Sequence, residues 1–119
     1  MSGLSPLELA EHDDGEAVVL AAAGIVDMAA APALADQVGA ILRRRPSTLV
    51  IDFTGVTFLA TAGMSVLMEA DRKCKELSIP FRVVAYGPIT SKPMELLGID
   101  DLLDIYPTVD DALHGIVRR

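Results

Sequence analysis

The stretch TLVIDFTGVTFLATAGMSVLM, residues 48–68, decides the fold of this chain. It begins with the apolar run Leu49–Ile51, which is typical of a strand buried in a sheet. Asp52 follows, Thr54-Gly55 is a turn signal, and a second short apolar piece comes next. From Thr61 onward the apolar spacing is helical. The stretch therefore predicts a strand, a turn and a helix in succession, which is the building unit of an α/β protein.

The rest of the chain continues this alternation of strands and helices. We expect strands over residues 6–11, 17–24, 48–53, 81–85 and 102–106, with a hairpin turn at 12–15 and the second strand buried on both faces. We expect helices over residues 30–44, 61–77, 90–97 and 108–117, the last capped by Thr108. The order β-β-α-β-α-β-α-β-α predicts an α/β fold with a mixed β-sheet of four to five strands and about four α-helices.

Length and composition indicate a single domain, residues 1–119, because a second hydrophobic core would not fit. The chain is 51% apolar but only 4% aromatic, so aliphatic side chains must build the core. The net charge is −7, and the one basic cluster, Arg43–Arg45, falls in the last turn of a predicted helix, where cations offset the helix dipole. We therefore expect no nucleic-acid binding, which needs a basic stripe, and favour a basic protein surface as partner.

Other features predict a cytoplasmic protein without a membrane segment. The first residues are acidic and lack the positive region of a signal peptide. The longest apolar run, residues 18–23, is far too short to cross a bilayer. The single Cys74 cannot form an internal disulfide, and its place on a helical pattern predicts a thiol in the core.

No enzymatic constellation is present in the sequence. His12 falls in the predicted hairpin turn and His114 lies near the C-terminus, and neither is close to a nucleophile motif. Metal-ligand spacings and glycine-rich phosphate loops do not occur. We therefore predict no catalytic residue, no metal and no cofactor.

The hydroxyl of Thr61 stands at a predicted helix start, where it has two possible roles. It can cap the free backbone N–H groups, or it can present its oxygen to phosphoryl chemistry near the positive end of the helix dipole. Asp27 lies in a comparable position, between an apolar strand and the first long helix, where a cap is the simplest role. Asp52 is expected to hold the turn at Thr54-Gly55.

The whole arrangement resembles the STAS domain, the fold of bacterial anti-sigma factor antagonists. In that family a strand ending in Asp leads, through a turn, to Asp-Ser-[Ser/Ala]-Gly-[Leu/Met/Ile] at a helix start. Here Asp52 matches the strand end, Thr61 the phosphoacceptor, and Ala62-Gly63-Met64 the residues that follow. Ala60 departs from the pattern, which usually has Asp. The resemblance covers roughly residues 7–117 and includes two further anchors, Gly24-x-x-Asp27 and Leu96-Leu97-Gly98-Ile99.

The resemblance implies an anti-sigma factor antagonist whose unphosphorylated form binds an anti-sigma factor of the histidine-kinase-like ATPase type and so releases a sigma factor. That partner would phosphorylate Thr61, with Ser65 as the rival acceptor, and a Ser/Thr phosphatase would reverse the reaction. Met64 and Met68 share a helix face with Thr61, and they are expected either to contact the partner or to widen the apolar stripe. The predicted partner-binding residues are Asp27, Ala60, Thr61, Gly63, Met64, Ser65 and Met68.

Two alternatives remain open at this point. STAS domains also serve as subunits of transporters, including lipid-transport systems. A response-regulator receiver would instead be phosphorylated at Asp52, with Mg²⁺ held by an acidic pair after its first strand. The acidic pair available here, Asp13-Asp14, is followed by a hairpin and not by a helix, which disfavours the receiver.

Overall fold

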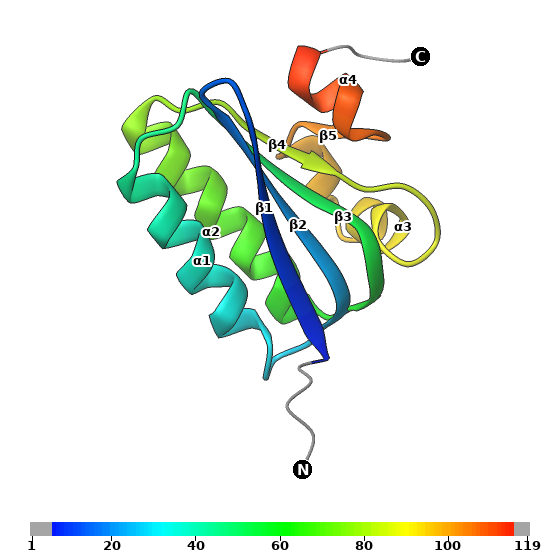
Figure 1. Ribbon diagram of the computed structural model, residues 1–119. Helices are drawn as coiled ribbons and strands as arrows, with labels where there is room; N and C mark the ends of the chain where they lie inside the picture. The colour runs from blue at the N-terminus through cyan, green and yellow to red at the C-terminus, as the bar shows by residue number, and fades with distance from the viewer. Residues whose placement is uncertain (1–5, 116–119) are drawn as a thin grey trace.

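The computed structural model describes residues 6–115, in which five strands form one sheet flanked by helices (Figure 1). The strands are β1 (Leu7–Asp14), β2 (Ala17–Val26), β3 (Thr48–Leu59), β4 (Phe81–Val84) and β5 (Ile105–Tyr106). The helical segments are α1 (Ala31–Arg43), α2 (Thr61–Leu77), α3 (Ser91–Leu96), the 3₁₀ turn η1 (Ile99–Asp101) and α4 (Val109–His114). The predicted order is confirmed, with η1 added between α3 and β5.

The sheet is mixed, and its strands lie in the order β1-β2-β3-β4-β5. The β1–β2 pair is an antiparallel hairpin, and each later strand pairs in parallel with the one before it. Each parallel connection contains a helix, as a crossover between parallel strands requires. A receiver of the CheY type has the strand order 2-1-3-4-5. The receiver alternative, with Asp52 as phosphoaspartate, is therefore wrong.

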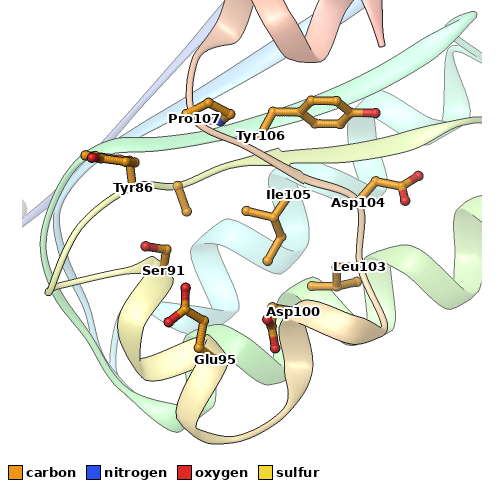
Figure 2. A pocket seen from close by; sticks show the side chains of 10 residues that line it. Tyr86, Ser91, Glu95, Asp100, Leu103, Asp104, Ile105, Tyr106 and Pro107 are labelled. Carbon is orange, nitrogen blue, oxygen red and sulfur yellow. The ribbon is translucent and has the colours of Figure 1, made fainter. Parts of the chain in front are cut away.

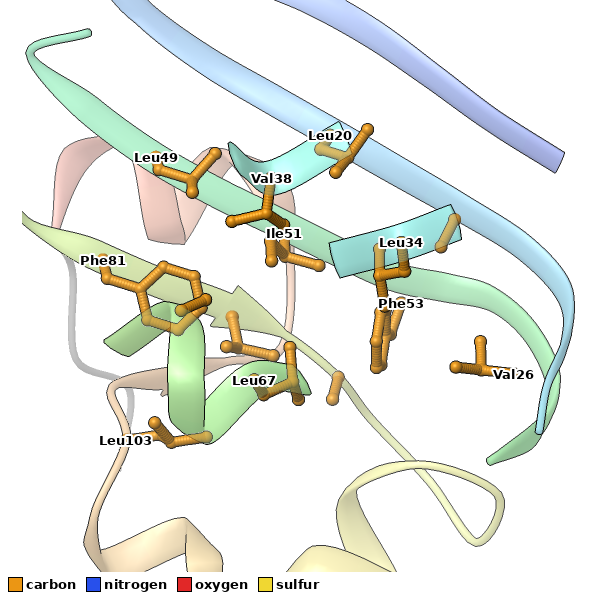
Figure 3. Packing of buried hydrophobic residues seen from close by; sticks show 14 of the residues in the cluster. Leu20, Val26, Leu34, Val38, Leu49, Ile51, Phe53, Leu67, Phe81 and Leu103 are labelled. Atoms are coloured by element: carbon orange, nitrogen blue, oxygen red, sulfur yellow. The ribbon is translucent and has the colours of Figure 1, made fainter. Parts of the chain in front are cut away.

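Helices α1 and α2 cover one face of the sheet, and the main core lies between these layers (Figure 1). The helix α1 buries the five apolar positions that its spacing predicts: Ala31, Leu34, Val38, Ile41 and Leu42. Four of them, all but Ala31, belong to the main core cluster together with Leu20, Ile51, Phe53 and Leu67, which are fully buried (Figure 3). The shorter α4 packs on the opposite face, against a smaller cluster that includes Val50 and Tyr106. No described helix is both long enough and apolar enough to span a bilayer.

The β2–β3 pair is longer than predicted, and the turn expected at Thr54-Gly55 is wrong. Strand β3 runs without interruption to Leu59, and β2 runs to Val26, past the break predicted at Gly24. Two register shifts between β2 and β3, each with one extra residue on β3, replace the predicted turn. A Cβ at Gly55 would lie 3.0 Å from the Cβ of Ala23, so glycine serves close strand approach there.

The other differences concern element ends. His12 is paired within β1, so its predicted turn position is wrong; the hairpin turns at Gly15 and Glu16. Strand β2 is buried on both faces only near its start, because Ala23 and Ile25 are exposed. Strand β5 is shorter than predicted and Thr108 caps α4 as expected, accepting from the Asp111 N–H at 3.1 Å. The predicted end of that helix, at residue 117, lies outside the described residues.

Candidate functional site

The strands β2 and β3 end side by side, and this edge of the sheet positions the candidate site. Val26 and Leu59 are register partners, and the Ala60 N–H donates to the Val26 carbonyl oxygen at 2.9 Å. The residues that follow, Asp27 on one strand and Thr61 on the other, therefore emerge next to each other at the carboxyl ends of parallel strands. Ligands and partners of open α/β sheets commonly bind at this edge.

Thr61 is the first residue of α2, and it does not cap the helix. The N-cap is Ala60, which has extended backbone (ψ 166°) and no side chain to accept a hydrogen bond. The Thr61 side chain is exposed, and its hydroxyl has no hydrogen-bond partner among residues 6–115. The first turn also carries no acidic residue, so the positive end of the dipole is not offset by a nearby carboxylate. The hydroxyl is thus available at an electropositive helix start.

Gly63 sets how closely α2 approaches the strand ends. A Cβ at this position would lie 2.5 Å from Val26 Cγ1 and 2.7 Å from Leu59 Cδ1, closer than real Cβ atoms come. Glycine is therefore required by packing, and its side chain offers nothing to a partner. Its part in partner binding stays a prediction.

The N-cap of α1 is Ala30, which makes no side-chain cap hydrogen bond, so the cap predicted for Asp27 is wrong. Asp27 instead holds the turn before the helix. Its Oδ1 accepts a hydrogen bond from the Ala30 N–H at 2.9 Å, and its carbonyl accepts from the Ala31 N–H at 2.9 Å. These bonds shape the turn that leads into α1 beside Thr61. Asp52 accepts from the Thr54 N–H at 2.9 Å, but it does so within the continuous strand β3.

The methionines differ from each other, and of the two roles expected for them Met64 takes the one in the apolar stripe. Met64 is 4% exposed and belongs to the main core, whereas Met68 is half-buried against that core. The helix turns Met64 toward the sheet because it lies one residue after Gly63, on the side that packs closest. Ser65 is exposed, and its hydroxyl donates to the Thr61 carbonyl oxygen at 3.2 Å.

Three exposed apolar residues near Thr61 were missed by the sequence reasoning. Ile25 and Phe58 are register partners at the ends of β2 and β3 and are 36% and 54% exposed. Met28, just after Asp27, is 79% exposed. We call the end of the molecule where β2 and β3 finish, with Ile25, Asp27, Met28, Phe58 and Thr61, the Thr61 face. Phe58 could have been found from the sequence only if β3 had been extended through Thr54-Gly55, because its orientation depends on that continuity.

Among residues 6–115, no group of three or more His, Cys, Asp or Glu side chains could hold a metal ion. Burial raises the pKa of the Cys74 thiol to about 11, with a smaller contribution from Asp71, so this sulfur is a protonated core group and a poor nucleophile. The arrangement can therefore present a hydroxyl and an apolar contact face to another protein.

Comparison with known proteins gives a consistent result. Residues 9–104 match the family model described as "Mlab, STAS domain". The anti-sigma-F factor antagonist RsfB of Mycobacterium tuberculosis is 33% identical over 116 residues, which cover 98% of this chain and 94% of that protein. The anti-sigma-F factor antagonist RsfA of the same species is 27% identical over 107 residues, covering 88% of this chain and 83% of its own.

Solved structures agree with these relatives. An anti-sigma factor antagonist from Mycobacterium paratuberculosis superimposes with a TM-score of 0.87 at 36% identity, covering 92% of this chain and 93% of that one. The anti-sigma factor antagonist SpoIIAA in its unphosphorylated form superimposes with a TM-score of 0.74 at 16% identity, covering 93% of this chain and 100% of that one. At that identity the second likeness concerns the fold alone.

Proposed function

This chain belongs to the STAS domain family, and from that premise we propose that it is an anti-sigma factor antagonist that binds an anti-sigma factor through the Thr61 face. Relatives that carry this name match it across nearly their whole length. These matches favour sigma-factor regulation over the alternative of a transporter or lipid-transport subunit. The protein would act in the cytoplasm, where sigma factors meet RNA polymerase.

The observation that carries the proposal is the composition of the Thr61 face. Met28 and Phe58 are large apolar side chains that the fold leaves more than half exposed. They lie at the same edge of the sheet as a hydroxyl that no described residue engages. Apolar side chains exposed around a polar group are typical of a protein-binding surface, because a partner can bury the former and hydrogen-bond the latter.

The regulatory step is phosphorylation of Thr61 by an anti-sigma factor of the histidine-kinase-like ATPase type. The Thr61 Oγ attacks the γ-phosphorus of ATP, the bond from that phosphorus to the β–γ bridging oxygen breaks, and ADP leaves. The hydroxyl proton passes to a base of the partner, because Ala60 supplies no carboxylate next to Thr61. A Ser/Thr phosphatase would hydrolyse the phosphoester and restore binding.

A phosphoryl group on Thr61 is expected to change the surface and leave the fold intact. The N–H groups of Thr61 and Ala62 donate to no other residue within 6–115, and the dipole end favours an anion. On the outside, nearly two negative charges would appear at the edge of the sheet that also carries Ile25 and Phe58. A partner that buries those side chains would have to desolvate this charge, so it would dissociate.

Thr61 is favoured over Ser65 as the acceptor because of their hydrogen bonds. The Ser65 hydroxyl is held against the Thr61 carbonyl, one turn along the helix and away from its free end. The Thr61 hydroxyl has no such bond and lies at the end itself. The substitution of Ala60 for the family's Asp favours slower phosphoryl transfer than in relatives with the acidic residue.

Purified candidate anti-sigma factors of the source organism, incubated with this protein and ATP, test the proposal. Peptide mapping is expected to find phosphate on Thr61 in the wild type and, to the same extent, in a Ser65→Ala variant. It is expected to find no phosphate in a Thr61→Ala variant. Thr61→Glu is expected to melt within a few degrees of the wild type but to bind the anti-sigma factor about tenfold or more weakly, a change of roughly 1.4 kcal/mol or more. Phosphate on Ser65 alone, or equal affinity for Thr61→Glu, would contradict the proposed switch.

A further inference from the structure

A second exposed apolar surface lies at the corner formed by α3 and η1, residues 94–104, which we call the α3–η1 corner. Leu96, Leu97 and Leu102 are 75%, 58% and 58% exposed. Met94 and Leu103 are the apolar anchors of this corner, with 0% and 6% exposure. Because these anchors already attach the corner to the core, folding does not account for the three exposed leucines. Such clusters of exposed leucines are typical of interaction sites.

The leucines are surrounded by negative charge. Residues 94–104 contain four acidic residues, Glu95, Asp100, Asp101 and Asp104, and no basic residue. The nearest cation along the chain, Lys92, pairs with Glu95 at 3.8 Å. These carboxylates do not form a group that could hold a metal ion within the described residues. Asp104 interacts with Lys75 of α2, whereas Asp100 and Asp101 form no ion pair among the described residues, so their charge is available to a positively charged partner.

The corner also contains a hollow of about 460 Å³ next to the leucines. Figure 2 shows Ser91 and Glu95 of α3 and Asp100 of η1 on one side of it, with Ile105 of β5 opposite. Tyr86 lies at its rim and is 79% exposed. An apolar and aromatic wall with carboxylates at the mouth fits a Lys or Arg side chain, whose stem packs on the wall while its head pairs with the acids.

The corner is continuous with the region around Thr61. A groove of about 550 Å³ follows the exposed side of α2, and both Thr61 and Ile99, the first residue of η1, line it. Met68 also lines this groove, as do four charged side chains of α2: Glu69, Asp71, Arg72 and Lys75. A protein that covers the Thr61 face can therefore extend along α2 to the corner without leaving the surface.

We propose that the α3–η1 corner is a second contact surface for the anti-sigma factor, and that it binds a segment of that protein with apolar residues flanked by Lys or Arg. This inference rests on the function proposed above, and it adds the chemistry of the partner and the residues that select it. The leucines supply buried contact area and hold the partner once bound. The acidic residues accelerate its approach and discriminate against partners that lack the basic residues.

Two other occupants fit the corner less well. A second copy of this chain in a symmetric dimer would bring four acidic residues against four, in a protein whose net charge is already −7. An anionic membrane surface would be repelled by the same charge. A basic segment of another protein satisfies both the leucines and the carboxylates.

The double variant Leu96→Gln/Leu102→Gln tests the apolar part of the inference, with the anti-sigma factor that phosphorylates Thr61 as the probe. Both side chains are more than half exposed, so circular dichroism melting should match the wild type. Surface plasmon resonance should show an affinity about tenfold or more lower, mainly through faster dissociation. Unchanged affinity in this folded variant would overturn the inference.

The double variant Asp100→Asn/Asp101→Asn tests the charged part, with Asp13→Asn/Asp14→Asn as the matched control. The control removes the same charge from the end of β1, beside the β1–β2 hairpin turn and away from the edge that carries Thr61. At low ionic strength, the corner variant should associate about two- to fivefold more slowly and the control should not, and high salt should remove the difference. Equal slowing in both would mean that only net charge matters, which contradicts the inference.

These outcomes separate the two proposals. If Thr61→Glu weakens binding and the corner variants do not, the proposed function stands and the corner is not a contact. If the wild-type protein binds no anti-sigma factor, both proposals fail. Light scattering of the protein without its partner gives its mass in solution. If mutation of Leu96 and Leu102 lowered that mass, the leucines would form a contact between copies, which would also overturn the inference.

Discussion

The two halves of helix α2 are built differently. Residues 61–68 contain no charged side chain, begin at a helix end without a side-chain cap and border the Thr61 face. Residues 69–77 contain six charged residues in nine, and their ion pairs are Arg72 with Glu69 and Glu76, and Lys75 with Asp71. The exposed side of the first half is neutral, whereas the exposed side of the second half carries paired charges.

This difference separates what folding needs from what binding needs. The buried stripe runs through both halves, with Leu67 in the first and Ala70 and Cys74 in the second. Packing against the sheet is therefore continuous along the helix. Only the exposed side changes, from a neutral surface that a partner can desolvate at low cost to a charged surface that prefers water.

The largest expected effect comes from charging the buried side of the first half. Met64→Lys should unfold the domain or destabilise it by about 4 kcal/mol, because an unpaired charge would enter a core site that is 4% exposed. Met68→Lys is the matched variant, since Met68 is half-buried and a lysine can extend its ammonium into water. Thermal melting followed by circular dichroism should show a clear loss for the first variant and a small one for the second. Similar melting temperatures for both would mean that Met64 is not a core residue.

An intermediate effect is expected where α2 approaches the strand ends. Gly63→Ala places a Cβ against Val26 and Leu59, and overpacking of this kind costs about 1–3 kcal/mol. Gly39→Ala in α1 is the control, because the nearest atom to its Cβ would be Arg43 Nη1 at 3.8 Å. There the gain in helix propensity should stabilise the protein by about 0.5–1 kcal/mol. Urea unfolding of both variants measures the two free energies, and opposite signs are expected. A stabilising Gly63→Ala would show that the strand ends give way.

Local patterns predicted most of the fold. The start and end of α2 and the buried positions of α1 follow from helical spacing alone, and both agree with the structure. The turn at Thr54-Gly55 was wrong because glycine has two uses. In a single strand it signals a turn, but here it allows Ala23 of the neighbouring strand to approach.

The candidate site was predicted only in part, for a related reason. Thr61 and Asp27 were found because they stand at element ends, which sequence patterns locate well. Ile25, Met28 and Phe58 were missed because their exposure depends on which strands pair and where their register shifts. The position of Met64 was left open because helical spacing places it beside Thr61, while the close approach at Gly63 turns it into the core.

The smallest expected effect concerns the charged half of α2. Arg72→Ala removes both of its pairs, with Glu69 and Glu76, but all three side chains are at least half exposed and water screens the interaction. The melting temperature should fall only slightly at low ionic strength, and the difference from wild type should vanish in about 1 M NaCl, where charges are screened within a few ångströms. Binding of the anti-sigma factor should change much less than in Thr61→Glu, because Arg72 lines the groove along α2 but its guanidinium is already paired with two carboxylates. If Arg72→Ala weakened binding as much as Thr61→Glu, the division of α2 into a binding half and a stabilising half would be wrong.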